Sequence, residues 1–121
     1  MELSRTDGQA LLILTNLPDE AGARDLATML VSRRLAACVN VLAPCHSVYR
    51  WQGAIESAQE VPLLIKTTAA RYADLEAAIR AAHPYELPEI IAVPIARGLP
   101  GYLDWLVTET RAEAADRDLP T

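Results

Sequence analysis

The chain has 121 residues and a formal net charge of -5, with 51% hydrophobic residues and no phenylalanine. This length fits one compact domain with a sizeable core. Because the sequence has no run of basic residues, we expect no nucleic-acid partner. Its apolar stretches are far shorter than the roughly 20 residues that cross a bilayer, so we expect no membrane partner either.

The N-terminal region is polar and shows no charged segment followed by an apolar run, so the sequence predicts no signal peptide. Two cysteines, Cys38 and Cys45, are too few for a disulfide scaffold. We therefore expect a cytoplasmic protein with reduced thiols. We interpret residues 1–121 as a single domain with a core at 10–112 and frayed termini at 1–9 and 113–121.

The first two elements are a buried strand and an amphipathic helix. The continuous apolar run Ala10–Thr15 is typical of a strand that is buried on both faces. Pro18 and Asp19 then open a helix, and the Asp19 side chain is a suitable N-cap. One apolar stripe runs along this helix and comprises Ala23, Leu26, Ala27 and Leu30.

The middle of the chain predicts an antiparallel hairpin. Cys38–Leu42 and Ser47–Trp51 both read as strand, and the softer segment Ala43–His46 joins them. We expect a turn within Gly53–Ala58, followed by a long strand over Glu60–Thr67. Two long strands in this order pair as antiparallel neighbours.

A second helix, a last strand and a closing helix complete the predicted order. Thr68 is the expected cap of the second helix, and Pro84 ends it. Its apolar stripe comprises Tyr72, Leu75, Ala78, Ile79 and Ala82. Pro94 within the strand Ile90–Ala96 removes one backbone donor, so this strand should lie at a sheet edge. Gly98 and Pro100 precede a closing helix whose inward side comprises Leu103, Leu106, Val107 and Thr110, with Tyr102 and Trp105 beside them.

This order predicts an α+β fold with the ferredoxin-like split βαβ arrangement, β-α-β-β-α-β, plus a C-terminal helix. Right-handed crossovers place the first two helices on one face of the sheet. The other face is too apolar to remain in water. The long central hairpin also overhangs the first strand and leaves edge groups unpaired. We therefore expect an obligate homo-oligomer.

Five short motifs then stand in a fixed order along the chain. They are Leu35–Asn40 (LAACVN), Ser47–Gly53 (SVYRWQG), Lys66–Thr68 (KTT), His83–Ile91 (HPYELPEII) and Gly101–Trp105 (GYLDW). In this order and spacing the set resembles the CutA family of divalent-cation tolerance proteins, from about Leu11 to Thr110. The resemblance implies a homotrimer with an architecture similar to that of PII signalling proteins.

The resemblance also implies a role in tolerance of divalent metals, copper in particular, as a metal-binding, small-ligand-binding or signalling module rather than an enzyme. The chain departs from the family pattern at two places. Gly98 is followed by Leu99 where the family usually has a polar residue, and the pair Cys45 and His46 is unusual at its position.

Three residues are candidate metal ligands: Cys38, His83 and Glu86. A thiolate at Cys38 suits soft ions such as copper, although a free cysteine on a strand is also a common small core residue. His83 follows a helix end, where an imidazole can bind metal or can satisfy the last helix carbonyls. Cys45 and His46 point to opposite faces of a strand and reach one ion only if the chain bends at Pro44.

Five residues are candidates for a ligand-binding cleft: Tyr49, Trp51, Glu60, Lys66 and Tyr85. Tyr49 and Trp51 share one face of a strand, where they either stack on a planar ligand or pack between subunits. Glu60 and Lys66 share a face but lie about 20 Å apart, so Lys66 needs another partner. That partner is either a carboxylate of a neighbouring subunit or an anionic ligand.

The sequence has no phosphate-binding loop, no nucleophile elbow and no Cys-x-x-Cys pair. The only cofactor we expect is a divalent or soft metal ion, with copper the leading candidate, and the only partners are further copies of the chain, a metal ion or a small molecule. Two alternatives stay open. One is an enzyme with an inter-subunit acid–base site built from Lys66, Glu60 and His83. The other is a structural trimer that anchors another protein.

Overall fold

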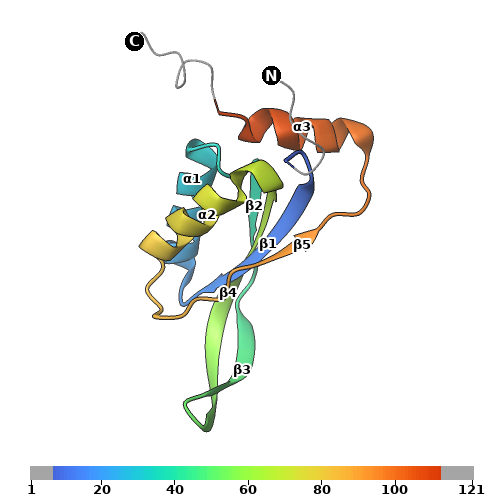
Figure 1. The fold of residues 1–121 in the computed structure, drawn as a ribbon. Coiled ribbons are helices and arrows are strands. Elements are labelled where there is room, and N and C mark those ends of the chain that lie inside the picture. The colour runs from blue at the N-terminus through green and yellow to red at the C-terminus, as the bar shows by residue number, and fades with distance from the viewer. Residues whose placement is uncertain (1–6, 113–121) are drawn as a thin grey trace.

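A computed structural model describes residues 7–112 (Figure 1). Of the termini expected at 1–9 and 113–121, residues 1–6 and 113–121 lie outside the described residues, whereas the Asp7 and Gln9 carbonyls accept hydrogen bonds from Ala70 and Ala69. The elements are β1 (Ala10–Leu17), α1 (Glu20–Ser32), β2 (Cys38–Val41), β3 (Cys45–Trp51), β4 (Ala54–Thr68), α2 (Ala69–Ala82), β5 (Ile91–Pro94) and α3 (Pro100–Thr110). None of the helices in residues 7–112 has the length and apolarity that a bilayer crossing requires.

The strands form one antiparallel sheet in the order β2-β4-β1-β5, and β3 pairs with the first part of β4. Because β2 and β3 both pair with β4, they act as one interrupted strand of the fold. The predicted ferredoxin-like split βαβ arrangement with an added C-terminal helix is therefore confirmed. β5 pairs with β1 at the edge of this order, which is the edge position predicted from the backbone donor that Pro94 lacks.

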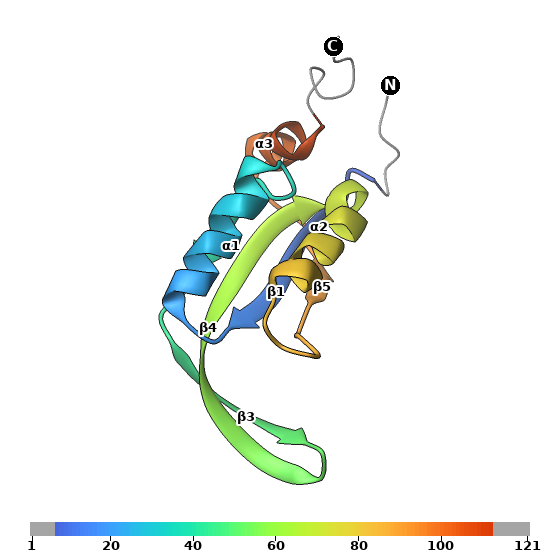
Figure 2. The ribbon, with the colours of Figure 1, turned by 90° about the vertical axis from the view of Figure 1, so that its left-hand side faces the viewer.

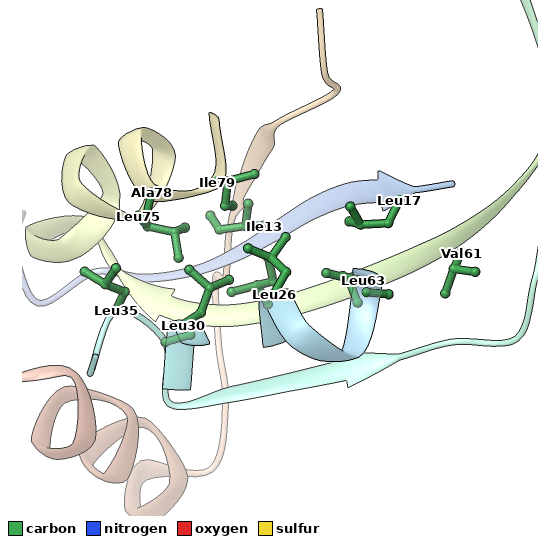
Figure 3. Packing of buried hydrophobic residues seen from close by; sticks show 13 residues of the cluster. Ile13, Leu17, Leu26, Leu30, Leu35, Val61, Leu63, Leu75, Ala78 and Ile79 are labelled. Carbon is green, nitrogen blue, oxygen red and sulfur yellow. The ribbon is translucent and has the colours of Figure 1, made fainter. Parts of the chain in front are cut away.

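The core lies between the sheet and the two helices α1 and α2, which cover the same face (Figure 2). Strand residues alternate between faces, so the odd-numbered side chains of β1 and β4 point into this layer. Figure 3 shows Ile13 and Leu63 meeting Leu26, Leu30 and Ile79 of the helices. These side chains are almost fully buried, which makes this layer the main source of hydrophobic stabilisation.

The two helices begin in different ways. Asp19 is the N-cap of α1, and its Oδ1 accepts a hydrogen bond from the Gly22 N–H at 2.7 Å, as predicted. Thr68 occupies the N-cap position of α2, as predicted, but its side chain makes no cap hydrogen bond. The first N–H groups of α2 donate instead to the backbone carbonyls of Gln9 and Asp7, at 2.9 and 3.0 Å.

The opposite face of the sheet, which we call the open face, carries an apolar patch. The patch residues are Leu12, Leu14, Leu64, Ile91 and Val93. Ile91 and Val93 are about half exposed, and the three leucines are half-buried. Helix α3 contacts only one end of this face, where it packs on β4 and β1 and buries Leu106 completely. The patch therefore lacks a cover among residues 7–112.

The hairpin of β3 and β4 projects from the body as an arm (Figures 1 and 2). β4 has 15 residues, and only its second half pairs with β1. The arm ends in a two-residue turn in which Gln52 and Gly53 both have positive φ, as a type I′ turn requires. The turn expected within Gly53–Ala58 is thus shorter, because residues from Ala54 onward belong to β4.

A β-bulge separates the arm from the body. Val41 pairs with Leu63 and Cys45 pairs with Glu60, so three residues of the β2–β3 connection oppose two residues of β4. Pro62 lies in this gap and accepts a hydrogen bond from the Leu42 N–H through its carbonyl. In a strand the N–H and C=O of a residue point to the same side. The donor that Pro62 lacks would therefore face the bulge, where the ladder is already interrupted.

Two buried threonines on the core face of neighbouring strands differ in one respect. Thr67 Oγ1 donates to the Leu35 carbonyl at 2.7 Å, whereas Thr15 Oγ1 has no partner within residues 7–112. Thr15→Val should therefore stabilise the protein by about 1 kcal/mol, since it removes a buried unpaired hydroxyl. Thr67→Val should destabilise it by about 1–2 kcal/mol, since it removes a made hydrogen bond.

Urea unfolding of both variants and the wild type at one protein concentration measures the two changes. The substitutions are chemically identical, so each is the control for the other. Changes of the same sign would contradict this interpretation of the two hydroxyls.

Candidate functional site

A cleft of about 960 Å³ lies between the arm and the loop that joins α2 to β5. We call it the arm cleft. Its walls are Ser47–Trp51 of β3, alternate residues of β4 from Glu56 to Glu60, and Tyr85–Glu89 of the loop, with Asn16 at the end of β1. The bulge decides which arm side chains lie on the same face as Glu60, because its extra residue places Tyr49 and Trp51, rather than Val48 and Arg50, on that face.

Glu60 and Tyr85 join the two walls of the arm cleft. The Tyr85 hydroxyl donates to Glu60 Oε2 at 3.0 Å, and Glu60 is only 8% exposed. Burial raises the pKa of Tyr85 to about 12, and the hydrogen bond to Glu60 and the Glu60 charge add to the rise. The phenol therefore stays protonated and remains a donor to the carboxylate near neutral pH.

The rest of the arm cleft is acidic and aromatic. Tyr49 pairs across the hairpin with Glu56, and burial followed by the Glu56 carboxylate raises the pKa of Tyr49. The lining has four glutamates and one arginine, which leaves a formal charge of -3; these residues are Glu56, Glu60, Glu86, Glu89 and Arg50. This combination can attract a cation and hold a flat group.

His83 anchors the loop that forms one wall. Its Nε2 lies 2.6 Å from the Asn16 carbonyl oxygen, and its Nδ1 lies 3.2 Å from the Tyr85 backbone N. A carbonyl only accepts and a backbone N–H only donates, so the ring is the tautomer with hydrogen on Nε2. Asn16 also donates through Nδ2 to Glu89 Oε1 at 3.1 Å. Both ring nitrogens are occupied, and a metal ion at His83 would have to displace one of these contacts.

Cys38 and Lys66 lie at the other end of β4, where they pair across β2 and β4. The Lys66 ammonium donates to Asn40 Oδ1 and lies 3.9 Å from Cys38 Sγ. Burial and the neighbouring Cys38 raise the pKa of Tyr102, which places α3 beside the thiol. Lys66 thus finds an amide partner within its own chain, whereas the sequence suggested a carboxylate or an anion.

The structure brings together five of the eight predicted site residues: Tyr49, Trp51, Glu60, Tyr85 and Glu86. Lys66, Cys38 and His83 do not line the arm cleft. Among residues 7–112, no three His, Cys, Asp or Glu side chains gather as a set of metal ligands. The three metal-ligand assignments therefore stay predictions that a single chain does not fulfil by itself. Likewise Lys66, Glu60 and His83 share no site within one chain.

Several lining residues were missed in the sequence. Glu56 lies four residues before Glu60, so the two share one face of a strand. This signal was readable, but it was hidden because residues 53–58 were interpreted as a turn. Asn16 and Glu89 come from segments far apart in the chain, and no local pattern connects them.

Comparison with known proteins agrees with this fold and these motifs. Residues 11–109 match the sequence pattern of the family described as CutA1 divalent ion tolerance protein. A divalent-cation tolerance protein CutA of Thermus thermophilus is 48% identical over 99 residues, which cover 82% of this chain and 96% of that protein. A CutA homolog of Xenopus laevis is 41% identical over 103 residues, which cover 85% of this chain and 68% of that protein. The crystal structure of CutA from Xylella fastidiosa has a TM-score of 0.83 at 47% identity, covering 85% of this chain and 99% of that one.

The interaction between Glu60 and Tyr85 predicts a measurable titration. Glu60→Gln should lower the pKa of Tyr85 from about 12 towards its ordinary value of 10, because the carboxylate charge is removed, while burial, the largest cause, and the smaller effects of Tyr49 and Asp19 remain. Ultraviolet absorbance of the phenolate across alkaline pH measures this change, and Tyr85→Phe identifies the step that belongs to Tyr85. Glu76→Gln is the control, since Glu76 acts on Tyr72 instead.

The same shift has a consequence for stability. The folded pKa of Tyr85 is raised, so its contribution is fully present below pH 10 and is lost as the pH rises towards about 12. Urea unfolding across this range should therefore show a smaller loss of stability in Tyr85→Phe than in the wild type. Equal losses in the two proteins would show that Tyr85 is not the titrating group.

Proposed function

The chain belongs to the CutA1 divalent ion tolerance family, and on that premise we propose that it is a homotrimeric binding module in divalent-cation tolerance. Its ligand site is the arm cleft, and it carries out no catalysis. One observation carries this proposal: Glu60, nine-tenths buried, lies in the wall of a large cleft that also holds two tyrosines, a tryptophan and three further carboxylates. Such a concave site, with aromatic walls and polar groups that converge on it, is typical of small-ligand binding.

The arrangement of titratable groups supports a binding role over an enzymatic one. Lys66 lies six residues from Glu60 along β4, a separation of about 20 Å. Both ring nitrogens of His83 are engaged by backbone groups. General acid–base catalysis needs its groups within hydrogen-bond reach of a shared substrate. The relatives are also named as tolerance proteins rather than as enzymes.

The open face supports the homotrimer and its PII-like architecture. Its apolar patch is contiguous across β4, β1 and β5, and α3 leaves most of it uncovered. The arm adds an edge, because β3 pairs only with β4 among the described strands. Burying the patch and pairing such an edge both favour association of identical chains. The cytoplasmic location remains part of this proposal, consistent with the free thiols of Cys38 and Cys45.

Val93→Asp tests the trimer. A charge in the middle of the apolar patch should cost several kcal/mol in a buried interface, so the variant should dissociate to monomers at micromolar concentration. Multi-angle light scattering after size-exclusion chromatography measures the mass. Val31→Asp is the control, since Val31 is exposed to a similar extent, 43% against 46%, but lies on α1. A wild-type monomer, or a trimeric Val93→Asp protein, would contradict the proposed interface.

Direct binding of copper is a second candidate function. Cys38 carries a free, half-buried thiol on the open face of edge strand β2, where neighbouring subunits can supply further ligands. Titration of the reduced protein with Cu(I) should show a site that Cys38→Ser removes. Cys45→Ser is the matched control and should keep it. Equal copper uptake by both variants would exclude Cys38 as the ligand.

The role in tolerance is tested in cells that lack the chain. We expect such cells to stop growing at lower copper concentration, and expression of the wild type should restore growth. The Val93→Asp and Glu60→Gln variants, expressed at the wild-type level, should restore it less well. Full restoration by both would remove the trimer and the arm cleft from the proposed function.

A further inference from the structure

We propose that the arm cleft binds a planar organic cation of the amidinium or guanidinium type. This inference rests on the proposed function in one respect, since it takes the arm cleft to be the ligand site. It adds the chemical class of the ligand, which neither the family name nor the relatives specify. The argument uses the unmet bonding capacity of Glu60, the aromatic walls and the spacing of the carboxylates.

Glu60 has bonding capacity to spare. Tyr85 donates to Oε2, and within the part of the chain that the structure describes no group donates to Oε1. A carboxylate offers about four acceptor positions, so most of its capacity is free. Among residues 7–112, Thr15 Oγ1 is the one buried side-chain N or O atom without a partner, so the unbonded Oε1 is accessible from the cleft, where a cation can reach it. Arg50 lines the same cleft but forms no ion pair with Glu60 in residues 7–112.

Two tyrosine rings lie near this carboxylate. Tyr85 comes from the opposite wall and donates to Glu60, and Tyr49 of β3 is affected by the Glu60 charge, which helps to raise its pKa. Trp51 shares their side of the arm but pairs with Ala54, about 20 Å along β4 from Glu60. Tyr49 lies close enough to Tyr85 that its charge affects the pKa of Tyr85. Aromatic faces attract cations and stack with flat groups. A ligand that is both flat and positive therefore matches the walls and the carboxylate together.

The spacing of the carboxylates disfavours a divalent ion as the occupant. Such ions need several oxygen ligands at about 2.0–2.6 Å from one point. Glu56 and Glu60 are four residues apart on one strand, about 13 Å along it, and Glu89 is engaged by Asn16. The lining also has no thiol and no imidazole, the groups that soft ions prefer. Carboxylates that are spread along the cleft, rather than gathered around one point, favour an organic cation over a metal ion.

Isothermal titration calorimetry with three flat molecules of nearly equal shape tests the class. Benzamidinium carries the positive charge, benzamide is its neutral counterpart, and benzoate is its anionic counterpart. We expect benzamidinium to bind at least about tenfold more tightly than benzamide, the factor expected from one hydrogen bond to a charged group. Benzoate should not bind. Equal affinities for benzamidinium and benzamide would overturn the proposal.

Variants locate the site. Glu60→Gln should weaken benzamidinium binding about tenfold or more, and Glu56→Gln should weaken it less, since Glu56 lies farther along the arm. Glu76→Gln on α2 is the control and should bind like the wild type. Tyr49→Leu should also weaken binding, because it removes the aromatic ring of β3 that lies nearest to Glu60. Unchanged affinity in Glu60→Gln, with its fold verified by circular dichroism, would overturn the assignment.

A parallel titration with magnesium and zinc chloride separates a cation in general from an organic cation. If either ion binds through Glu60 and displaces benzamidinium, the arm cleft is a metal site and this inference fails. A monomeric wild type would instead contradict the proposed trimer and leave the benzamidinium result standing. The two proposals therefore fail through different measurements.

Discussion

The fifteen residues of strand β4 alternate between two faces, one that packs in the core and one that forms the open face and the arm cleft, and the rest of the molecule is arranged around this alternation. Its odd-numbered side chains in the second half lie under α1 and α2, where Leu63 and Ile65 are fully buried. Its even-numbered side chains lie on the open face and in the arm cleft, from Leu64 to Glu60 and on to Glu56. Because the period of a strand is two, a slip of one residue would exchange the core with the cleft.

Much of the body could be predicted because its signals are local. The stripe of α1, the Asp19 cap and the edge position of β5 each follow from a few neighbouring residues whose physical effect does not depend on distant contacts. Thr68 stands at the N-cap of α2, but its side chain makes no cap bond, because Asp7 and Gln9, far away in the sequence, supply the acceptors for the first turn of α2. A propensity rule cannot anticipate a partner that tertiary structure brings in.

The candidate site was predictable only in part, for a similar reason. Tyr49, Trp51 and Glu60 were selected by their alternation on strands, and the arm does place them on one face. The small and polar residues after Gly53 are as compatible with a turn as with an exposed strand, so the length of the arm was hidden. Nor does the sequence reveal that three residues oppose two at the bulge. The hydrogen bond between His83 Nε2 and the Asn16 carbonyl joins two segments that are far apart in the sequence, so no local pattern predicts it.

Because of the bulge, a small rotation at the base of the arm produces a large displacement at its tip. Within residues 7–112, no ladder to β1 restrains the hairpin beyond Val61, and across the arm cleft a single side-chain hydrogen bond, from Tyr85 to Glu60, joins it to the loop. The seven residues of β3 extend about 23 Å, so a rotation of about 10° at the bulge moves the tip by roughly 4 Å. Small changes of spacing at the base are thereby amplified at the Gln52–Gly53 tip. The bulge is the point about which such a rotation occurs, and the length of the hairpin sets how far its tip is displaced.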